Sequence, residues 1–182
     1  MAYTNCALNS GFDLDCRDAV GGVKSVRLAS LEDYEAIDAE VASGAITGWN
    51  SPSTSGNEPF YKYDQLKETS SMTETINGSS QNGTVYYTPE VIIVLSKLDV
   101  NKRNEIKLLA QQRLVAIVET NDGNYWVVGY ENGLELNTGT SATGTAFADL
   151  SGYNFTLSGL EKEPMLSITE ALTTSETNAT QA

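Results

Sequence analysis

The chain has no histidine among its 182 residues and only two cysteines. Without histidine it lacks the usual general base near neutral pH, and the Ser-His and Cys-His pairs that activate nucleophiles. A zinc site would need four cysteines or help from carboxylates. No apolar run approaches the roughly 20 residues that span a bilayer. We therefore expect no enzyme, no metal and no cofactor.

Basic side chains are also scarce, with 11 Lys and Arg against 24 Asp and Glu, a formal net charge of −13. A surface this acidic repels phosphate backbones, because nucleic-acid binders need Lys and Arg to displace counterions. The acidity either maintains solubility or suits a wall that DNA passes without being held. The length and a hydrophobic content of 40% indicate one globular domain, residues 1–168.

Residues 1–20 show no regular pattern and predict an N-terminal arm. No basic flank precedes an apolar stretch, so we expect a protein made in a cytosol, where reduced thiols at Cys6 and Cys16 are favoured over a small disulfide loop. Clustered aspartates of the arm lack the spacing of a calcium-binding loop and are expected to be solvated: Asp13, Asp15 and Asp18. The Thr/Ser/Ala-rich residues 169–182 predict a flexible tail.

Short apolar segments separated by Gly, Asn and Thr predict a mainly β fold, a sandwich or barrel core with one clear helix. Leu114–Glu119 and Tyr125–Gly129 predict a hairpin around Asp122-Gly123. A first strand is expected at Val23–Ala29, followed by a short acidic helix whose spacing runs from Leu31 to Val41. Further strands are expected at 45–49, 145–147, 153–157 and 165–168.

The most unusual predicted element is a long hairpin over residues 60–95. Its arms, Phe60–Ile76 and Thr84–Leu95, exceed the typical strand of about 5–6 residues, so something must cover their edges. Either neighbouring copies pair with it, or it folds over its own core. For the first alternative, the candidate oligomerisation residues are Leu66, Thr69, Ser71, Thr73, Thr75, Tyr86 and Tyr87.

Residues 99–112 predict the clear helix, capped by Asp99 or Asn101. Five of the 11 basic residues lie at 97–113. Three interpretations stay open: a nucleic-acid contact, a contact with an acidic surface of another copy, or a solvated helix face. Three aromatic residues, Tyr125, Trp126 and Tyr130, either line a sugar or peptide groove or belong to the core.

Two sequence motifs, one early and one late in the chain, combine Gly, Asp and aromatic residues at fixed spacing. An early D-C-R-D-x-x-G-G-[IV]-K-x-V pattern occupies residues 15–26. A late pattern combines W-x-x-G-x-x-x-G-L-x-L with T-G-x-A-x-x-D-x-x-G-Y over residues 126–153. The matching positions are Asp15, Cys16, Arg17, Asp18, Gly21, Gly22, Val23, Lys24, Val26, Trp126, Gly129, Gly133, Leu134, Leu136, Thr143, Gly144, Ala146, Asp149, Gly152 and Tyr153.

These motifs resemble those of a family of phage tail proteins. The resemblance implies a major tail tube protein, which assembles into hexameric rings stacked around a DNA channel. Its partners would be other copies of itself and other tail proteins such as sheath, terminator or baseplate. Its location would be the virion tail, assembled in the host bacterial cytoplasm, and DNA would pass without specific binding. The long hairpin would line the channel, with Glu68 and Glu74 as lining acids. The alternatives are a head-decoration or head–tail connector protein, and a carbohydrate- or protein-binding β-sandwich.

Overall fold

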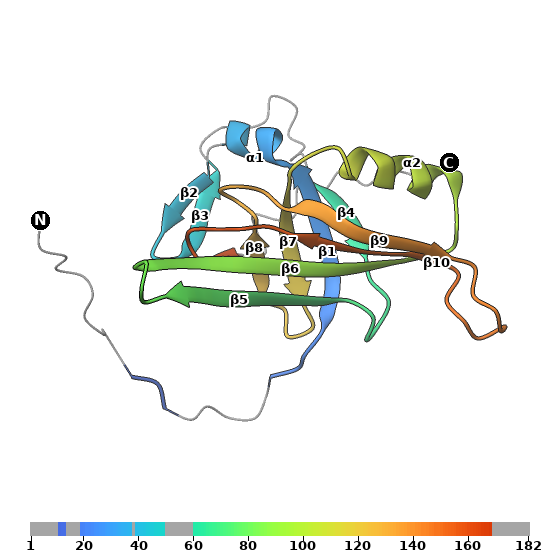
Figure 1. Cartoon of the computed structure of the whole chain (residues 1–182), viewed down its shortest axis with the longest axis horizontal. Helices are drawn as coiled ribbons and strands as arrows, with labels where there is room; N and C mark the ends of the chain where they lie inside the picture. Colours follow the sequence, from blue (N-terminus) through green and yellow to red (C-terminus); the bar gives the residue numbers. More distant parts are fainter. Residues whose placement is uncertain (1–10, 14–18, 38, 50–59, 169–182) are drawn as a thin grey trace, which may run out of the picture.

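The computed structural model describes residues 11–13, 19–37, 39–49 and 60–168. Cys6, Cys16 and the predicted tail at 169–182 lie outside the described residues. The fold is mainly β, as predicted, and consists of two sheets that do not close into a barrel (Figure 1). None of the described helices has the length and apolar character needed to cross a membrane.

The larger sheet has seven strands in the order β2-β3-β11-β8-β7-β1-β4. All pairings are antiparallel except β11 with β3. The predicted hairpin at 114–129 is confirmed as β7 and β8. The strand bounds are β1 Val23–Ser30, β2 Ala39–Ala42, β3 Ala45–Trp49, β4 Tyr61–Asp64, β7 Leu114–Thr120, β8 Tyr125–Val128 and β11 Leu166–Ile168.

The smaller sheet has four antiparallel strands in the order β5-β6-β10-β9. At the start of β10, a Cβ on Gly152 would lie 2.1 Å from the Leu95 carbonyl oxygen of β6, so the close approach of these strands requires glycine. The strand bounds are β5 Ser71–Ser79, β6 Thr84–Ser96, β9 Glu135–Ala142 and β10 Gly152–Ser158.

The hydrophobic core has two layers because the seven-stranded sheet is covered on both faces. Val91, Phe155 and Leu157 of the small sheet pack in the first layer with Leu28 and Val118 of the large sheet, among others. The other face of the small sheet carries mostly polar side chains, with Ile92 half-buried and Val94 buried among them.

The second core layer lies on the opposite face of the large sheet, beneath α1, Leu31–Ile37. Tyr34 of α1 meets Phe60 edge to face, with ring centroids 6.5 Å apart, over Ile117 and Val127. The first turn of α1 is fixed because Ser30 Oγ accepts a hydrogen bond from the Asp33 N–H at 3.1 Å.

Helix α2, Val100–Leu109, is the predicted basic helix, three residues shorter at its C-terminal end. Asp99 caps it by accepting a hydrogen bond from the Asn101 N–H at 3.0 Å, as predicted. Leu109 and Ile106 attach the helix to the core between the sheets.

The predicted hairpin at 60–95 is wrong in its first arm, which the structure divides between the two sheets. Residues 61–64 form β4 and pair with β1, for example Tyr61 opposite Leu28. The chain then turns, and only β5 pairs with β6. Alternation of side chains indicates a strand but not its partner. The prediction therefore treated β4 and β5 as a single strand.

Two shorter segments also differ from the sequence predictions. The acidic helix ends at Ile37 rather than reaching Val41, because Ala39–Ala42 pairs with β3 across a tight turn. Ser43 and Gly44 have φ values of 53° and 80°, the two positive values of a type I′ turn. The predicted strand at 145–147 is instead part of the loop between β9 and β10.

Candidate interaction surface

The outer face of the four-stranded sheet is a polar surface arranged in rows. The strand register brings one exposed or half-buried side chain from each strand into line across the sheet. Threonine and serine dominate these rows. One row is Thr73, Glu90, Ser158 and Glu135; the next is Ser71, Ile92, Thr156 and Thr138.

No strand of this sheet contains Lys or Arg. Glu90 and Glu135 are exposed and lie on either side of Ser158 in one row. Two strand spacings separate their backbones by about 10 Å. The outer face is therefore neutral to acidic and offers no cation to a phosphate group.

Both edges of this sheet are open within the described part of the chain. The order β5-β6-β10-β9 leaves β5 and β9 each with one strand partner. Such edges present unpaired backbone N–H and C=O groups that another strand can bind. They run for nine and eight residues, longer than the four-residue edge strands β2 and β4 of the large sheet.

The structure brings some of the predicted oligomerisation residues together and separates others. Ser71, Thr73 and Thr75 are exposed on the outer side of edge strand β5. Tyr86 is exposed on the same face, opposite Asn77.

The remaining three predicted oligomerisation residues lie elsewhere. Tyr87 occupies the opposite side of β6, where its backbone N–H and C=O both pair with Glu161 at 2.8 Å. Leu66 and Thr69 lie in the turn before β5, where the Thr69 hydroxyl donates to the Leu66 carbonyl at 2.8 Å.

The predicted lining acids Glu68 and Glu74 do not share a face. Glu68 sits in the turn before β5 with φ 61°. Glu74 is on the core side, where its Oε1 accepts a hydrogen bond from the Met165 N–H at 2.8 Å. The outward acids of the sheet are Glu90 and Glu135, which the sequence could have indicated only if the strand boundaries had been known.

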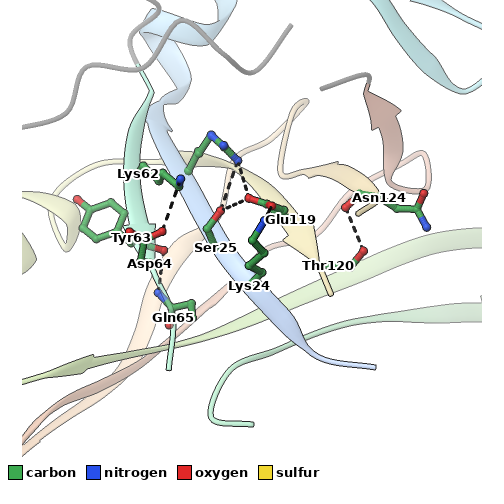
Figure 2. A network of polar contacts seen from close by, with 10 residues as sticks. Lys24, Ser25, Lys62, Tyr63, Asp64, Gln65, Glu119, Thr120 and Asn124 are labelled. Atoms are coloured by element: carbon green, nitrogen blue, oxygen red, sulfur yellow. Dashed lines mark hydrogen bonds and ion pairs between the residues drawn. The ribbon is translucent and has the colours of Figure 1, made fainter. Parts of the chain in front are cut away.

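A buried charged cluster on the large sheet was missed by sequence reasoning (Figure 2). Glu119 is 3% exposed and accepts a hydrogen bond from Ser25 Oγ at 2.6 Å. It also pairs with Lys24 and, at 3.5 Å, with Arg27, whose guanidinium lies 5.5 Å from the centre of the Tyr125 ring.

Burial alone would raise the pKa of Glu119, but hydrogen bonds from Lys24 and Ser25, with the charges of Lys24 and Arg27, outweigh burial and lower it. A carboxylate with a lowered pKa is a weak general base toward Ser25. The cluster is therefore suited to joining β1 and β7 rather than to activating a nucleophile.

A hollow of about 940 Å³ lies between α2, β4 and β6. The Tyr63 hydroxyl donates to Glu105 Oε1 at 3.0 Å across it, and burial followed by the Glu105 charge raises the Tyr63 pKa. Among the described residues, no three carboxylates or thiols are grouped so that they could hold a metal ion.

The three aromatic residues considered for a sugar groove do not form one. Tyr125 and Trp126 are neighbours in β8, so their side chains point to opposite faces of the sheet. Tyr125 belongs to the second core layer, and the Tyr130 hydroxyl donates to the Pro164 carbonyl at 3.2 Å. This arrangement removes the main observation that favoured carbohydrate binding.

The chain matches no family model, no curated protein and no solved structure.

Proposed function

We propose that this protein is a self-assembling virion structural protein, the repeating subunit of a phage tail tube. The observation that carries the proposal is the four-stranded sheet, with two long open edges and an outer face without Lys or Arg. The resemblance of residues 15–26 and 126–153 to tail tube proteins supports the same function.

Assembly would proceed by continuing the small sheet from copy to copy. Strand β5 of one subunit would pair with β9 of the next, so that each subunit uses two different surfaces. Such a head-to-tail contact closes into a ring when the rotation per subunit matches a closed symmetry. Ring closure would satisfy every open backbone group along the two edges and remove the aggregation hazard that they carry.

The outer face of the small sheet would then line the channel. Its threonine and serine rows, with Glu90 and Glu135 as the outward acids, would present a wall that repels the DNA backbone rather than holding it. The seven-stranded sheet would lie outside and support this lining. The protein would act as a passive conduit with no catalytic step.

A head-decoration or head–tail connector protein is the second candidate. It shares the β-rich fold and the acidic composition, but it does not require the two edges of one sheet to pair with each other. The edges therefore provide the test.

Electron microscopy of the purified protein is expected to show hollow tubes or six-fold rings. A proline scan of residues 137–142 on β9 sharpens this test, because alternate N–H groups point to β10 and to the open edge. Prolines at the edge-facing positions should leave a folded monomer that forms no tubes. Proline at Val41, on edge strand β2 of the large sheet, is the control and should leave assembly intact.

A wild-type protein that stays monomeric at all concentrations, or tubes that persist through the whole β9 scan, would refute the proposed assembly. Rings without tubes that still form throughout the β9 scan would favour the connector, because its assembly does not require the two edges to pair.

A further inference from the structure

The loop between β9 and β10, residues 143–151, presents a phenylalanine to solvent. Phe147 is fully exposed and Leu150 is 42% exposed. Exposed large aromatic side chains are costly to leave in water and are frequent anchors of protein interfaces. The loop extends from one end of the small sheet (Figure 1).

This loop is held in shape by Asp149. Its Oδ2 accepts hydrogen bonds from the Thr145 N–H at 2.8 Å and the Ala146 N–H at 2.7 Å, and these bonds lower the pKa of the carboxyl group. Gly144 has φ 71°, and a Cβ there would lie 2.5 Å from the Asp149 Cβ. Because the turn is ordered before any contact forms, Phe147 would bind with a smaller loss of conformational entropy.

The opposite end of the same sheet carries a matching apolar groove. The β5–β6 hairpin extends beyond the core there, leaving Ile76 69% and Val85 60% exposed. Beside it, Leu160 is 62% exposed. A groove of about 430 Å³ at this end is lined by Thr84, Val85, Tyr86, Asn132, Leu160, Glu161 and Lys162.

We propose that Phe147 of one copy inserts into this groove of the next copy along the axis of the tube. The inference rests on the proposed function and adds to it the contact that stacks successive rings. Since the loop and the groove lie at opposite ends of one sheet, each subunit can both donate a loop and accept one. A contact between two different surfaces that does not close on itself extends as a filament.

Charge agrees with this pairing of surfaces. Lys162, at the groove, is the only Lys or Arg from residue 114 to the end of the chain. Asp149 is the acid of the inserted loop. The groove also contains Glu161, but Glu161 is 3% exposed, so Lys162 is the exposed charge of its lining. Docking brings Asp149 toward Lys162, whereas a loop-to-loop contact between two copies would bring two aspartates together.

Cysteine crosslinking tests the contact directly. In a protein with Cys6→Ser and Cys16→Ser, the double variant Phe147→Cys with Leu160→Cys should form, on mild oxidation, a ladder of disulfide-linked dimers, trimers and longer chains. Phe147→Cys paired with Val41→Cys, an exposed position on β2, is the control and should form no ladder. Dimers from Phe147→Cys alone, or no ladder from the first pair, would overturn the proposal.

A mixing experiment tests whether the contact joins two different surfaces. Phe147→Ala should raise the protein concentration needed for half-maximal tube growth by about tenfold, which is about 1.4 kcal/mol for each contact. Leu160→Asp should do the same by placing an acid in the groove. Mixed below the concentration at which either variant alone grows, the two variants should form heteromers that stop growing after one contact, because one retains the intact groove and the other the intact loop.

The control for these variants is Val41→Ala, which should assemble as the wild type does. If Phe147→Ala and Leu160→Asp form tubes at wild-type concentrations, the inference fails and the tube function stands. If the wild-type protein forms neither rings nor tubes, the proposed function fails instead.

Discussion

The two sheets of this protein face each other but differ in how completely they are buried. The seven-stranded sheet is covered on both faces, and its charged side chains Arg27 and Glu119 are almost completely buried. The four-stranded sheet is covered mainly on one face, and its outer acids Glu90 and Glu135 are exposed. The large sheet therefore holds the core of the fold, whereas the outer face of the small sheet is accessible in the single chain.

The largest expected difference between the sheets concerns their glutamates. Glu119→Gln should lower the free energy of unfolding by about 3 kcal/mol, because it leaves Arg27 buried without its full counter-charge. Glu90→Gln, on the small sheet, should change it by less than about 0.5 kcal/mol. Urea unfolding in dilute solution measures both. Equal effects would mean that the two sheets are not divided as we describe.

A matched pair of isoleucines should give a difference in unfolding free energy of similar size. Ile117 on β7 is fully buried, whereas Ile92 on β6 lies half-buried on the outer face of the small sheet. Ile117→Ala should cost about 2–5 kcal/mol of unfolding free energy, because it opens a cavity. Ile92→Ala should cost about 1 kcal/mol in the monomer, since less apolar area returns to water. The same urea titrations apply, and a greater loss at Ile92 would contradict the comparison.

The pH dependence of stability should have opposite signs at two buried glutamates. The lowered pKa of Glu119 stabilises the fold above the ordinary pKa of glutamate, and this contribution is lost as the pH falls toward the folded value. Burial raises the pKa of Glu161, although N–H groups at 131–133 oppose it. Its contribution therefore weakens as the pH rises from the ordinary value toward the raised one.

Unfolding of Glu119→Gln and Glu161→Gln from about pH 3 to pH 8 separates these two effects. The deficit of Glu119→Gln relative to wild type should shrink in acid. Glu161→Gln should remove a fall in stability that the wild type shows as the pH rises, since the buried Glu161 Oε2 has no hydrogen-bond partner among the described residues. Parallel profiles for all three proteins would refute both assignments.

Local patterns in the sequence predicted the elements whose partners are close along the chain. The β7–β8 hairpin around Asp122-Gly123 and the cap by Asp99, one of the two candidate caps, were both predicted correctly. Each depends on residues at most about a dozen positions apart, where turn chemistry and capping decide the structure.

Long-range pairing could not be predicted in this way. Residues 61–64 join β1 across more than 30 positions, and Glu119 meets Ser25 across 94. Nothing in the alternation of side chains specifies such partners. The predicted long hairpin therefore had a first arm that was too long, and the buried cluster around Glu119 was not predicted. The outward acids changed from Glu68 and Glu74 to Glu90 and Glu135 for the same reason, because strand boundaries decide which face a residue occupies.

The smallest expected change in stability gives the most direct test of what the small sheet does. Glu90→Lys with Glu135→Lys should change the unfolding free energy by less than about 0.5 kcal/mol, because both side chains are exposed. If this face lines a channel, the assembled variant should retain short duplex DNA, and more salt should release it, since each added cation displaces counterions. Wild-type tubes should retain none.

The control, Glu32→Lys with Glu35→Lys on α1, reverses two exposed charges away from the small sheet and should leave retention of DNA unchanged. Equal retention by the two double variants would place the outer face of the small sheet away from the channel, while leaving the comparison between a buried and an open sheet intact.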